Sequence, residues 1–466
     1  MKNFKYVSLF SGIGGFEQAL NKLGGECVLA SEIDKFANQA YEIIYGEKTV
    51  GDITKVNAED VPDHDLLVGG FPCQAFSVAG KRGGFDDARG TLFFEMARIA
   101  AEKMPKVILA ENVKGLISHD KGKTLDTIVK TLNECGYRVD FDVLNSKYFG
   151  VPQNRERIFI VAVREDLVEN EPWLIEGKNV VAKGKHRISE YDDVKTFNFD
   201  FPNNDVVTNK LRDILEPIVE ERYYLSEEKT AKLVAKLNDD ERSNTPKCVH
   251  NIYGGFKEAK PRVFDNESPT IRTSSGGGHL PSVLEEVKGL PIREATNKGY
   301  AVAREGDAVN FQFPDSKTRR GRVGKQIAQT LEASNINQGV VESFIARNGN
   351  VTMESSMEDI KRECEIIQLG HTGTGGQRGR IIGTYGISPC LSATEYKQPT
   401  QIADSPMYRI RKLIPLECFR LQGFSDQIHQ KLVDAGISDS QRYKMAGNAV
   451  TTNVIEAIGK NLLPYI

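Results

Sequence analysis

The strongest constraint on the fold is the alternation of apolar and amphipathic segments along the first 165 residues. Buried strands separated by helical crossovers favour parallel pairing, with helices on both faces of the sheet. The sequence therefore predicts an α/β fold with a doubly wound, mostly parallel sheet. The apolar runs are KYVSLF, CVLASEI, DLLVGGF, VILAEN and RIFIVAV.

The composition is that of an ordinary globular protein. Its 466 residues, of which 39% are hydrophobic and 27% charged, suggest two or three domains and exclude a disordered chain. The sequence has no run of roughly 18 apolar residues and its start lacks a signal-peptide pattern, so we expect a cytoplasmic protein without membrane contact. The net charge of −3 does not by itself indicate nucleic-acid binding, because a whole-chain sum can conceal a basic face.

The seven cysteines are scattered along the chain and none forms a CxxC pair. Neither a zinc site nor a disulfide framework has the spacing that it requires. We therefore expect free thiols and no metal. The cysteines are Cys27, Cys73, Cys135, Cys248, Cys364, Cys390 and Cys418.

The composition changes twice along the chain. After about Asn170 the sequence becomes charged and loop-rich, and between Val249 and Ile402 it is rich in Gly, Ser, Thr, Asn and Gln. After Tyr408 it returns to helical patterning, which could rejoin the first domain. We therefore divide the chain into residues 1–170, 171–407 and 408–466.

A glycine-rich turn, FSGIGG, follows the first apolar run and precedes a helical segment. Such a turn brings backbone amides near an adenosine-type cofactor, and Glu32 stands where a carboxylate could bind ribose hydroxyls. The spacing is not GxGxxG, which disfavours a dinucleotide. A purely structural glycine turn is the alternative.

Two reactive side chains follow later apolar runs. Cys73 comes directly after DLLVGGFP, and Glu111 ends VILAE. Ligands of open parallel sheets bind beyond the carboxyl ends of the strands, so these side chains could share one pocket. A buried hydrophobic cysteine and a helix-capping acid are the alternatives.

Arg155 and Arg157 precede the run RIFIVAV and would lie on one face if that segment is extended. Two guanidinium groups on one face suit an anionic or carbonyl-rich ligand. An exposed basic strand end is equally consistent with this pattern.

Six motifs occur together in one order: FSGIGG, GGFPCQAFS, ENV, QNRER, RLQGF and GNAV. Their order and spacing resemble those of the DNA cytosine-C5 methyltransferases of bacterial and phage restriction-modification systems. The similarity covers about residues 5–165 and 408–460. The resemblance implies the fold of S-adenosylmethionine-dependent methyltransferases, with a smaller β-rich target-recognition domain in the middle of the chain.

By this resemblance the chain would bind S-adenosylmethionine and no metal. Glu32 would contact the ribose and Asp52 would lie near the adenine amine. The cofactor-binding residues would be Phe10, Gly12, Gly15, Glu32, Ile33, Asp52, Ile53, Pro72, Asn448 and Val450.

The resemblance also implies the chemistry. The Cys73 thiolate would add to C6 of cytosine and so make C5 nucleophilic. Glu111 would bond N3 and the exocyclic amine, and Arg157 would lie near O2. The catalytic residues would be Cys73, Glu111, Arg155 and Arg157.

The expected partner is double-stranded DNA, from which the target base must be flipped. The glycine-punctuated segment 74–90 is a candidate lid. Basic runs in the middle region could contact phosphates, although a charge run is usually a solvated face. Candidate DNA contacts are Gln74, Ser77, Lys81, Arg82, Arg320, Arg322 and Arg380.

A weak repeat in the middle region relates SPTIRT, AQTLEA and SPCLSA, with Thr270, Thr330 and Cys390 at equivalent places. It indicates either several recognition modules or one domain built from similar β pieces, and we favour the second. We expect a monomer, with a cognate endonuclease as a possible functional companion. The competing interpretations are an RNA cytosine methyltransferase, a nucleotide-cofactor oxidoreductase, and a DNA-binding protein without catalysis.

Overall fold

The computed structural model describes residues 3–72, 92–203, 205–217, 219–224, 246–250, 261–271, 281–287 and 407–466, and short strands between residues 290 and 403. The chain forms two compact units, one of residues 1–284 and 410–466 and the other of residues 285–409. Residues 171–284, which we grouped with the middle region, thus cluster with the first unit. The functional division into three segments stays a prediction.

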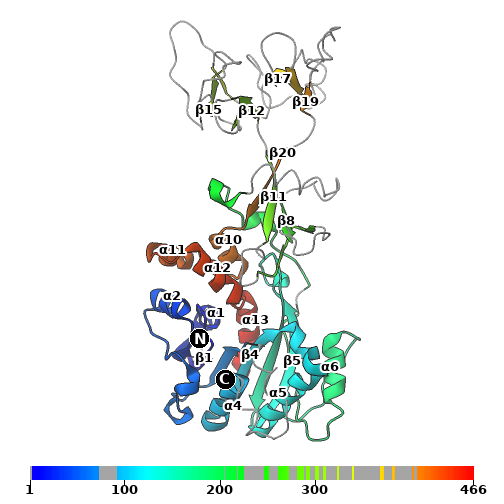
Figure 1. The fold of residues 1–466 in the computed structure, drawn as a ribbon. Coiled ribbons are helices and arrows are strands. Elements are labelled where there is room, and N and C mark those ends of the chain that lie inside the picture. Colours follow the sequence, from blue (N-terminus) through cyan, green and yellow to red (C-terminus); the bar gives the residue numbers. More distant parts are fainter. Residues whose placement is uncertain are drawn as a thin grey trace. The chain divides into compact units, whose positions relative to one another are not determined.

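A six-stranded sheet lies at the centre of the first unit (Figure 1). Its order is β2-β1-β3-β4-β7-β5, in which the first four strands are parallel and β7 runs antiparallel to both neighbours. The predicted mostly parallel α/β sheet is confirmed. Its strands are β1 (Phe4–Leu9), β2 (Gly25–Ser31), β3 (Leu66–Gly70), β4 (Val107–Val113), β5 (Tyr137–Asn145) and β7 (Glu156–Arg164).

Strand β5 was missing from the sequence prediction. Its sequence, YRVDFDVLN, alternates apolar with polar residues and so contains no continuous apolar run. Among the described strands its partner is β7, at one edge of the sheet, and Val139 adds an isolated bridge to Thr196. A search for the continuous apolar runs of central strands overlooks an edge strand of this kind.

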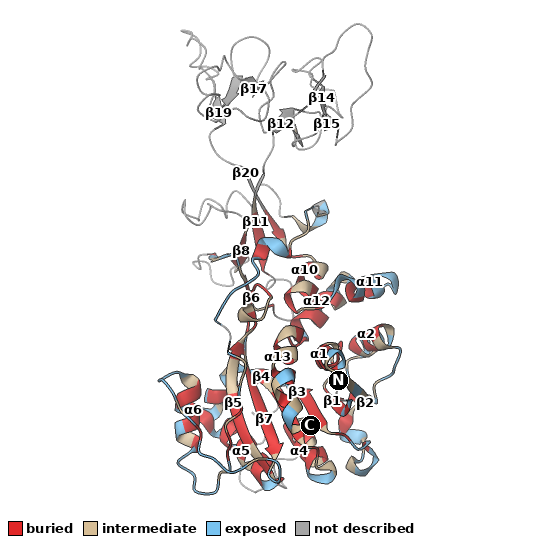
Figure 2. Ribbon diagram, turned by 180° about the vertical axis from the view of Figure 1, so that it is seen from behind, coloured by how far each residue is buried: buried red, intermediate tan, exposed pale blue. Residues whose placement is uncertain are grey.

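Helices cover both faces of the sheet because successive strand residues point to opposite sides. Val7 and Leu9 pack in one core with α4 and α5, whereas Tyr6 packs in the other with α1 and α13. The strands between these layers are buried (Figure 2), which is the doubly wound arrangement. The helices are α1 (Gly15–Leu20), α4 (Leu92–Lys103), α5 (Lys123–Glu134) and α13 (Thr452–Leu462).

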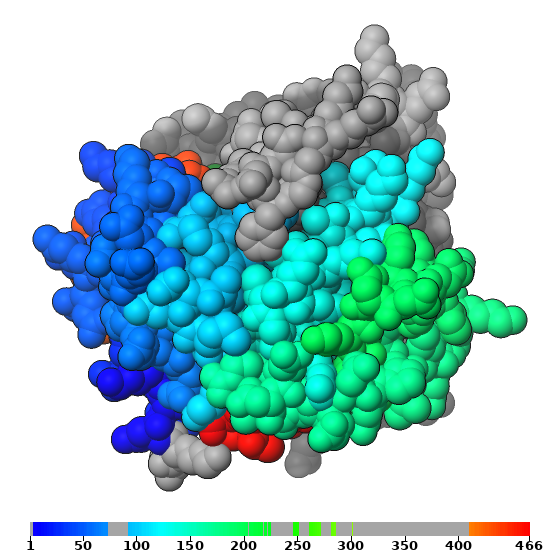
Figure 3. All heavy atoms as spheres, turned by 90° about the horizontal axis from the view of Figure 1, so that it is seen from below, coloured from blue at the N-terminus to red at the C-terminus, as the bar shows by residue number. Residues whose placement is uncertain are grey.

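The last residues of the chain return to the core of the first unit. Figure 3 shows the C-terminal residues in red beside the N-terminal segment in blue and the segment near residue 200 in green. The ring of Tyr465 lies 6.2 Å from those of Phe197 and Phe199. The C-terminal residues therefore cover one face of the sheet to which β1, near the N-terminus, belongs.

A third core joins α2 to three helices from the end of the chain. The Asp34 carboxylate caps α2 by accepting from the amides of Phe36 and Ala37, and Gly46 ends the helix at a φ of 76°. The helices are α2 (Lys35–Tyr45), α10 (Pro415–Leu421), α11 (Asp426–Asp434) and α12 (Asp439–Asn448).

Smaller sheets and one more helix complete the first unit. A four-stranded sheet has the order β20-β11-β8-β9, and β10 pairs in parallel with β6. Within the part of the chain that the structure describes, no helix has the length and apolar character to span a membrane. The elements are β6 (Gln153–Asn154), α6 (Val180–Ile188), β8 (Lys247–His250), β9 (Arg262–Asp265), β10 (Ser268–Pro269), β11 (Ser282–Val287) and β20 (Met407–Lys412).

The described part of the second unit consists of short strands in three small sheets, of orders β12-β13, β15-β14-β16 and β17-β18-β19. The described residues of this unit are β strands, in agreement with the β-prone composition of the middle region. Its strands are β12 (Leu290–Arg293), β13 (Tyr300–Ala303), β14 (Ala308–Asn310), β15 (Val323–Gly324), β16 (Gln338–Val340), β17 (Gln368–His371), β18 (Arg380–Gly383) and β19 (Gln401–Ala403).

Candidate functional site

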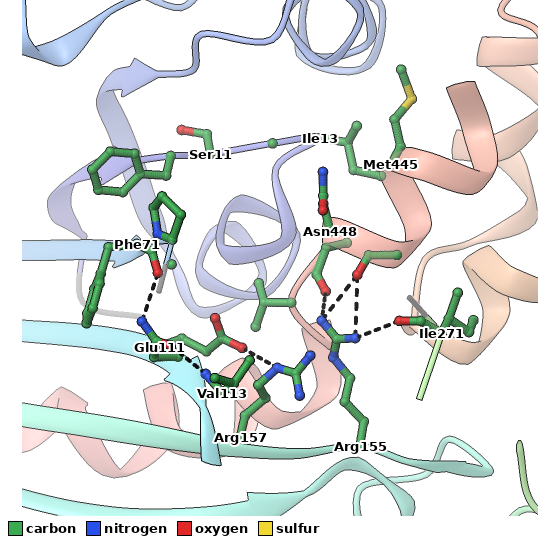
Figure 4. A pocket seen from close by; sticks show the side chains of 18 of the residues that line it. Ser11, Ile13, Phe71, Glu111, Val113, Arg155, Arg157, Ile271, Met445 and Asn448 are labelled. Carbon is green, nitrogen blue, oxygen red and sulfur yellow. Dashed lines mark hydrogen bonds and ion pairs between the residues drawn. The ribbon is translucent and has the colours of Figure 1, made fainter. Parts of the chain in front are cut away.

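A pocket of about 890 Å³ opens in the first unit, at the carboxyl ends of the parallel strands (Figure 4). This is the edge of an open parallel sheet at which ligands bind. The turns after β1, β2, β3 and β4 contribute to its wall, as do residues 154–157 before and at the start of β7. Two late segments, residues 270–271 and 444–450, complete it.

The glycine-rich turn and Glu32 form one side of the pocket. One carboxylate oxygen of Glu32 accepts from the Gly12 amide at 2.8 Å, and the other accepts from the Ile33 and Asp34 amides. These bonds fix the backbone so that the Ile33 side chain lies on the pocket wall while 74% exposed. Phe10 has a φ of 57°, a left-handed conformation that is uncommon for a residue other than glycine.

Glu111 and Arg157 form an ion pair at the next part of the wall, with 3.0 Å between Glu111 Oε1 and Arg157 Nε. Their side chains are only 12% and 17% exposed, so solvent screens the pair weakly. Gly70 is the register partner of Glu111 on β3, and a Cβ there would lie 3.1 Å from Glu111 Oε2. The Glu111 carboxylate can therefore accept, and the adjacent Arg157 guanidinium can donate, hydrogen bonds to a ligand in the pocket.

Asn112, next to Glu111, holds the end of β3 in place. Its Nδ2 donates to the Phe71 carbonyl at 2.9 Å, and its Oδ1 accepts from the Val113 amide. Pro72 follows Phe71 and lines the pocket. Cys73 is the next residue and lies outside the described part of the chain, as do Gln74, Ser77, Lys81 and Arg82.

Arg155 differs from Arg157, although we predicted that both would face one ligand. Its side chain is buried, with its Nη atoms donating to the carbonyls of Ile271, Gly447 and Ala449. Arg155 lies between β6 and β7 rather than within a strand. Both arginines line the same pocket, so the expectation of a shared ligand stays a prediction.

Comparison with known proteins decides the family. The match to the C-5 cytosine-specific DNA methylase family covers residues 4–463. The chain belongs to this family. The methyltransferase is 39% identical over 472 residues to the orphan methyltransferase M.SPRI of Bacillus phage SPR, covering 99% of this chain and 98% of the relative.

Two further comparisons agree. The methyltransferase is 38% identical over 316 residues to the type II methyltransferase M.HhaI of Haemophilus parahaemolyticus, which covers 68% of this chain and 86% of the relative. In structure it is similar to the crystal structure of S. pombe Dnmt2 methyltransferase, with a TM-score of 0.51 at 16% identity and 99% of both chains covered. That structural likeness supports the fold alone. The family membership makes the chain a DNA cytosine-C5 methyltransferase, so an oxidoreductase is excluded.

The methyltransferase's pocket brings together most of the predicted catalytic and cofactor-binding residues. Gly15 is not on the wall, but it supports the pocket through its close approach to Val450. The wall includes Phe10, Gly12, Glu32, Ile33, Pro72, Glu111, Arg155, Arg157, Asn448 and Val450.

Asp52 and Ile53 do not line this pocket. The Asp52 carboxylate accepts hydrogen bonds from the amide and hydroxyl of Thr54, which lower the pKa of Asp52, and Ile53 is buried in the core. The predicted contact of Asp52 with adenine thus stays a prediction. Of the predicted phosphate contacts, Arg380 begins β18, while Arg320 and Arg322 lie outside the described residues.

Several residues of the methyltransferase's pocket were not predicted from the sequence. Thr270 and Ile271 reach the wall from a segment that had been noticed only as part of the repeat. Lys444 also lies on the wall and pairs with the Asp34 carboxylate. The signal in the sequence was the repeated SPTIRT pattern, whose first copy lies at the pocket.

Proposed function

We propose that this enzyme transfers a methyl group from S-adenosylmethionine to C5 of a cytosine flipped out of a specific duplex DNA sequence. One observation carries the proposal. The glycine turn with Glu32, the Glu111–Arg157 pair and Pro72, which precedes Cys73, all border the same pocket. A cofactor and a base bound in that pocket would lie next to each other and next to the chain that carries the thiol.

The residues present fit S-adenosylmethionine. Glu32 Oε2 accepts only from the Gly12 amide and keeps a lone pair for a ribose hydroxyl, and the exposed Ile33 side chain offers an apolar surface to an adenine ring. Asn448 is an exposed residue of the same wall, and its amide could bind the polar end of the cofactor. When bound, S-adenosylmethionine supplies the methyl group as an electrophile.

The protein residues would then act on the cytosine ring. The Cys73 thiolate adds to C6, and the electron pair moves onto C5, which becomes nucleophilic. Glu111, held by Arg157, would accept a hydrogen bond from the exocyclic amine and share a proton with N3 as charge builds on the ring, while Arg157 would lie near O2. C5 would take the methyl group with its electron pair, which leaves S-adenosylhomocysteine. Loss of the C5 proton to solvent would then re-form the C5–C6 double bond and expel the thiolate from C6.

The relatives suggest the biological setting. They are named orphan methyltransferases of Bacillus phages and type II methyltransferases of bacteria. We infer that this enzyme marks DNA for restriction-modification or for phage self-protection. A cytoplasmic monomer, with any cognate endonuclease acting separately on the same site, is the simplest form of this proposal.

The decisive experiment traps the adduct. Duplex DNA that carries 5-fluorocytosine at the target should form a covalent complex at Cys73, because fluorine at C5 cannot leave as a proton does. Bisulfite sequencing of DNA from an expressing host identifies the target and shows whether methylation occurs. Methylation without a crosslink at Cys73 would refute the proposed mechanism.

Matched cysteine variants provide the controls. Cys73→Ser should abolish both methylation and crosslinking while leaving DNA binding largely intact. Cys27→Ser removes a half-buried free thiol outside the pocket wall and should preserve both. Parallel assays with an RNA transcript of the target test the RNA alternative, for which we expect no turnover.

A further inference from the structure

Two polar side chains of α12 line the pocket of the enzyme. From Arg442 to Val450 the exposed residues are Lys444 and Asn448, and both belong to the pocket wall. They are four residues apart and therefore lie on the same face of the helix. Asn448 has a predicted role in cofactor binding, whereas Lys444 has not been given one.

The Lys444 amine binds a carboxylate from near the start of the chain. Lys444 Nζ donates to Asp34 Oδ2, and the two side chains are 46% and 31% exposed. The other oxygen of Asp34 accepts from the amides of Phe36 and Ala37 and so caps α2. Partial burial alone would raise the pKa of Asp34, but the bonds from Lys444 and the Ala37 amide hold that pKa below its usual value of 3.8. Asp34 is therefore ionised at neutral pH.

Asp34 belongs to the turn that carries the proposed ribose ligand, Glu32. The Asp34 amide donates to Glu32 Oε1 at 2.7 Å, and the amide of Ile33 donates to the same oxygen at 2.8 Å. The Asn38 side chain of α2 donates to the Glu32 carbonyl at 3.0 Å. The positions of the Glu32 carboxylate and of the Ile33 side chain thus depend on where the start of α2 is held.

Helix α2 is bound to the C-terminal helices near both of its ends (Figure 1). Lys444 binds Asp34 at the start of α2, and Lys431 of α11 donates to the Ile44 carbonyl at 3.3 Å near its end. Ala40 and Ile44 pack between them in the core that α2 shares with α10, α11 and α12. Lys444 lies on the pocket wall and Lys431 does not. The two lysines therefore hold one helix, but only Lys444 does so at the pocket.

We propose that Lys444 is a positioning residue for cofactor binding, which holds Glu32 and Ile33 in place through its ion pair with Asp34. This inference rests on the proposed function. A turn that already has the geometry of the bound state needs less ordering when the ligand arrives. Without the ion pair, the fraction of molecules with a competent turn should fall, and the apparent affinity should fall by the same factor.

The test measures the dissociation constant of S-adenosylhomocysteine by titration calorimetry. Lys444→Gln and Asp34→Asn should each weaken binding by about threefold to fivefold, the range expected for a partly exposed ion pair. Asparagine is as good a helix cap as aspartate, so Asp34→Asn removes the charge and keeps the start of α2. The double variant should bind no more weakly than either single variant, because each substitution breaks the same pair.

Three measurements separate positioning from a general loss of stability. Lys431→Gln removes the other lysine that holds α2 and should keep the native affinity. Lys444→Arg keeps the positive charge and should recover most of the affinity that Lys444→Gln loses. In Lys444→Gln the KM for S-adenosylmethionine should rise by the same factor as the dissociation constant, with kcat nearly unchanged, since binding is weakened equally before and in the transition state.

Thermal unfolding shows which variants are folded, and Asp34→Asn tests the same pair if Lys444→Gln does not fold. The inference is overturned if a folded Lys444→Gln or Asp34→Asn variant keeps the native dissociation constant, or if the two losses add in the double variant. It is also overturned if Lys431→Gln weakens binding as much as Lys444→Gln, which would mean that packing of α2 alone matters. If instead the native enzyme neither binds S-adenosylhomocysteine nor methylates DNA, the proposed function itself fails.

Discussion

Glu17, on α1 behind the glycine turn, is completely buried. Burial raises the pKa of Glu17 from 4.5 to about 7, and the nearby hydroxyls of Ser8, Ser11 and Tyr41 oppose this rise only partly. The folded protein therefore binds this proton more tightly than the unfolded chain does. The contribution of Glu17 to stability is complete below pH 4.5 and is lost as the pH rises to about 7.

The burial of Glu17 predicts that the free energy of unfolding depends on pH. Between pH 5 and pH 8 the free energy of unfolding should fall by about 2 to 3 kcal/mol on account of Glu17. Glu17→Gln cannot ionise and should show a decline smaller by that amount in urea unfolding at the two pH values. Glu42→Gln, at an exposed position of α2, should leave the decline unchanged. Equal declines in Glu17→Gln and the native protein would contradict the assignment.

A substitution at Gly15 tests the contact between the glycine turn and Val450, which come from opposite ends of the chain. A Cβ at this position would lie 2.6 Å from Val450 Cγ1, so Gly15→Ala must displace a residue of the pocket wall. We expect the affinity for S-adenosylhomocysteine to fall by about tenfold or more, measured by titration calorimetry. Adding Val450→Ala restores the space and should recover part of the loss. Additive losses in the double variant would show that the two residues act separately.

Among the secondary structure elements, β20 and α10 are joined by a buried ion pair. Arg411 and Glu417 have fully buried side chains, and two contacts of 2.9 Å join their nitrogen and oxygen atoms. Glu417 also accepts from the amides of Ile414 and Glu216. One carboxylate therefore connects the strand that returns from the second unit, the helix after it, and the segment at residue 216.

Removing this charge should be costly. Glu417→Gln leaves the Arg411 cation buried without its partner, so we expect the free energy of unfolding to fall by about 3 to 5 kcal/mol in urea titration. Glu456→Gln breaks the Lys460 pair on the surface of α13 and should cost less than about 1 kcal/mol. Equal losses in both variants would mean that burial does not set the strength of the Arg411–Glu417 pair.

The whole molecule is built so that one compact unit contains the pocket and both ends of the chain. The chain leaves this unit along β11 and returns along β20, which are neighbours in one sheet. The Leu413 amide donates to the Pro281 carbonyl at 3.3 Å beside this crossing point. The ends created by removing residues 285–409 therefore lie close enough for a short linker.

This arrangement predicts that the first unit functions in part without the second. With residues 285–409 replaced by a short Gly-Ser linker, the protein should fold and bind S-adenosylhomocysteine within about threefold of the full chain. It should lose sequence-specific methylation, which we assign to the removed region. Retention of methylation at the native target, measured by bisulfite sequencing, would disprove that assignment.

The contrasting variant is a chain that ends before residue 410 and so lacks the C-terminal segment. It would remove Val454, Ile455 and Ile458 of α13 from the core beside β1 and β3. The exposed apolar face of the sheet should then prevent folding, seen as insoluble expression. A soluble, folded truncation would mean that α13 is dispensable for this core.

How far the sequence determines the structure can be judged from particular residues. The apolar runs of β1, β3 and β4 and the motif residues Gly12 and Glu111 were readable, because burial and turn geometry impose local patterns. The pairing of Glu111 with Arg157 was not readable. It depends on β7 lying antiparallel beside β4, with Val113 opposite Arg157.

The type of fold, the family and the motif residues of the pocket could be predicted from the chain alone, since these follow from local periodicity and ordered motifs. The edge position of β5, the bonds of Arg155 to backbone carbonyls and the approach of Gly15 to Val450 became known only from the three-dimensional structure. These contacts join residues far apart in the chain. Which residues meet depends on how the layers pack in three dimensions. No short stretch of sequence encodes this packing.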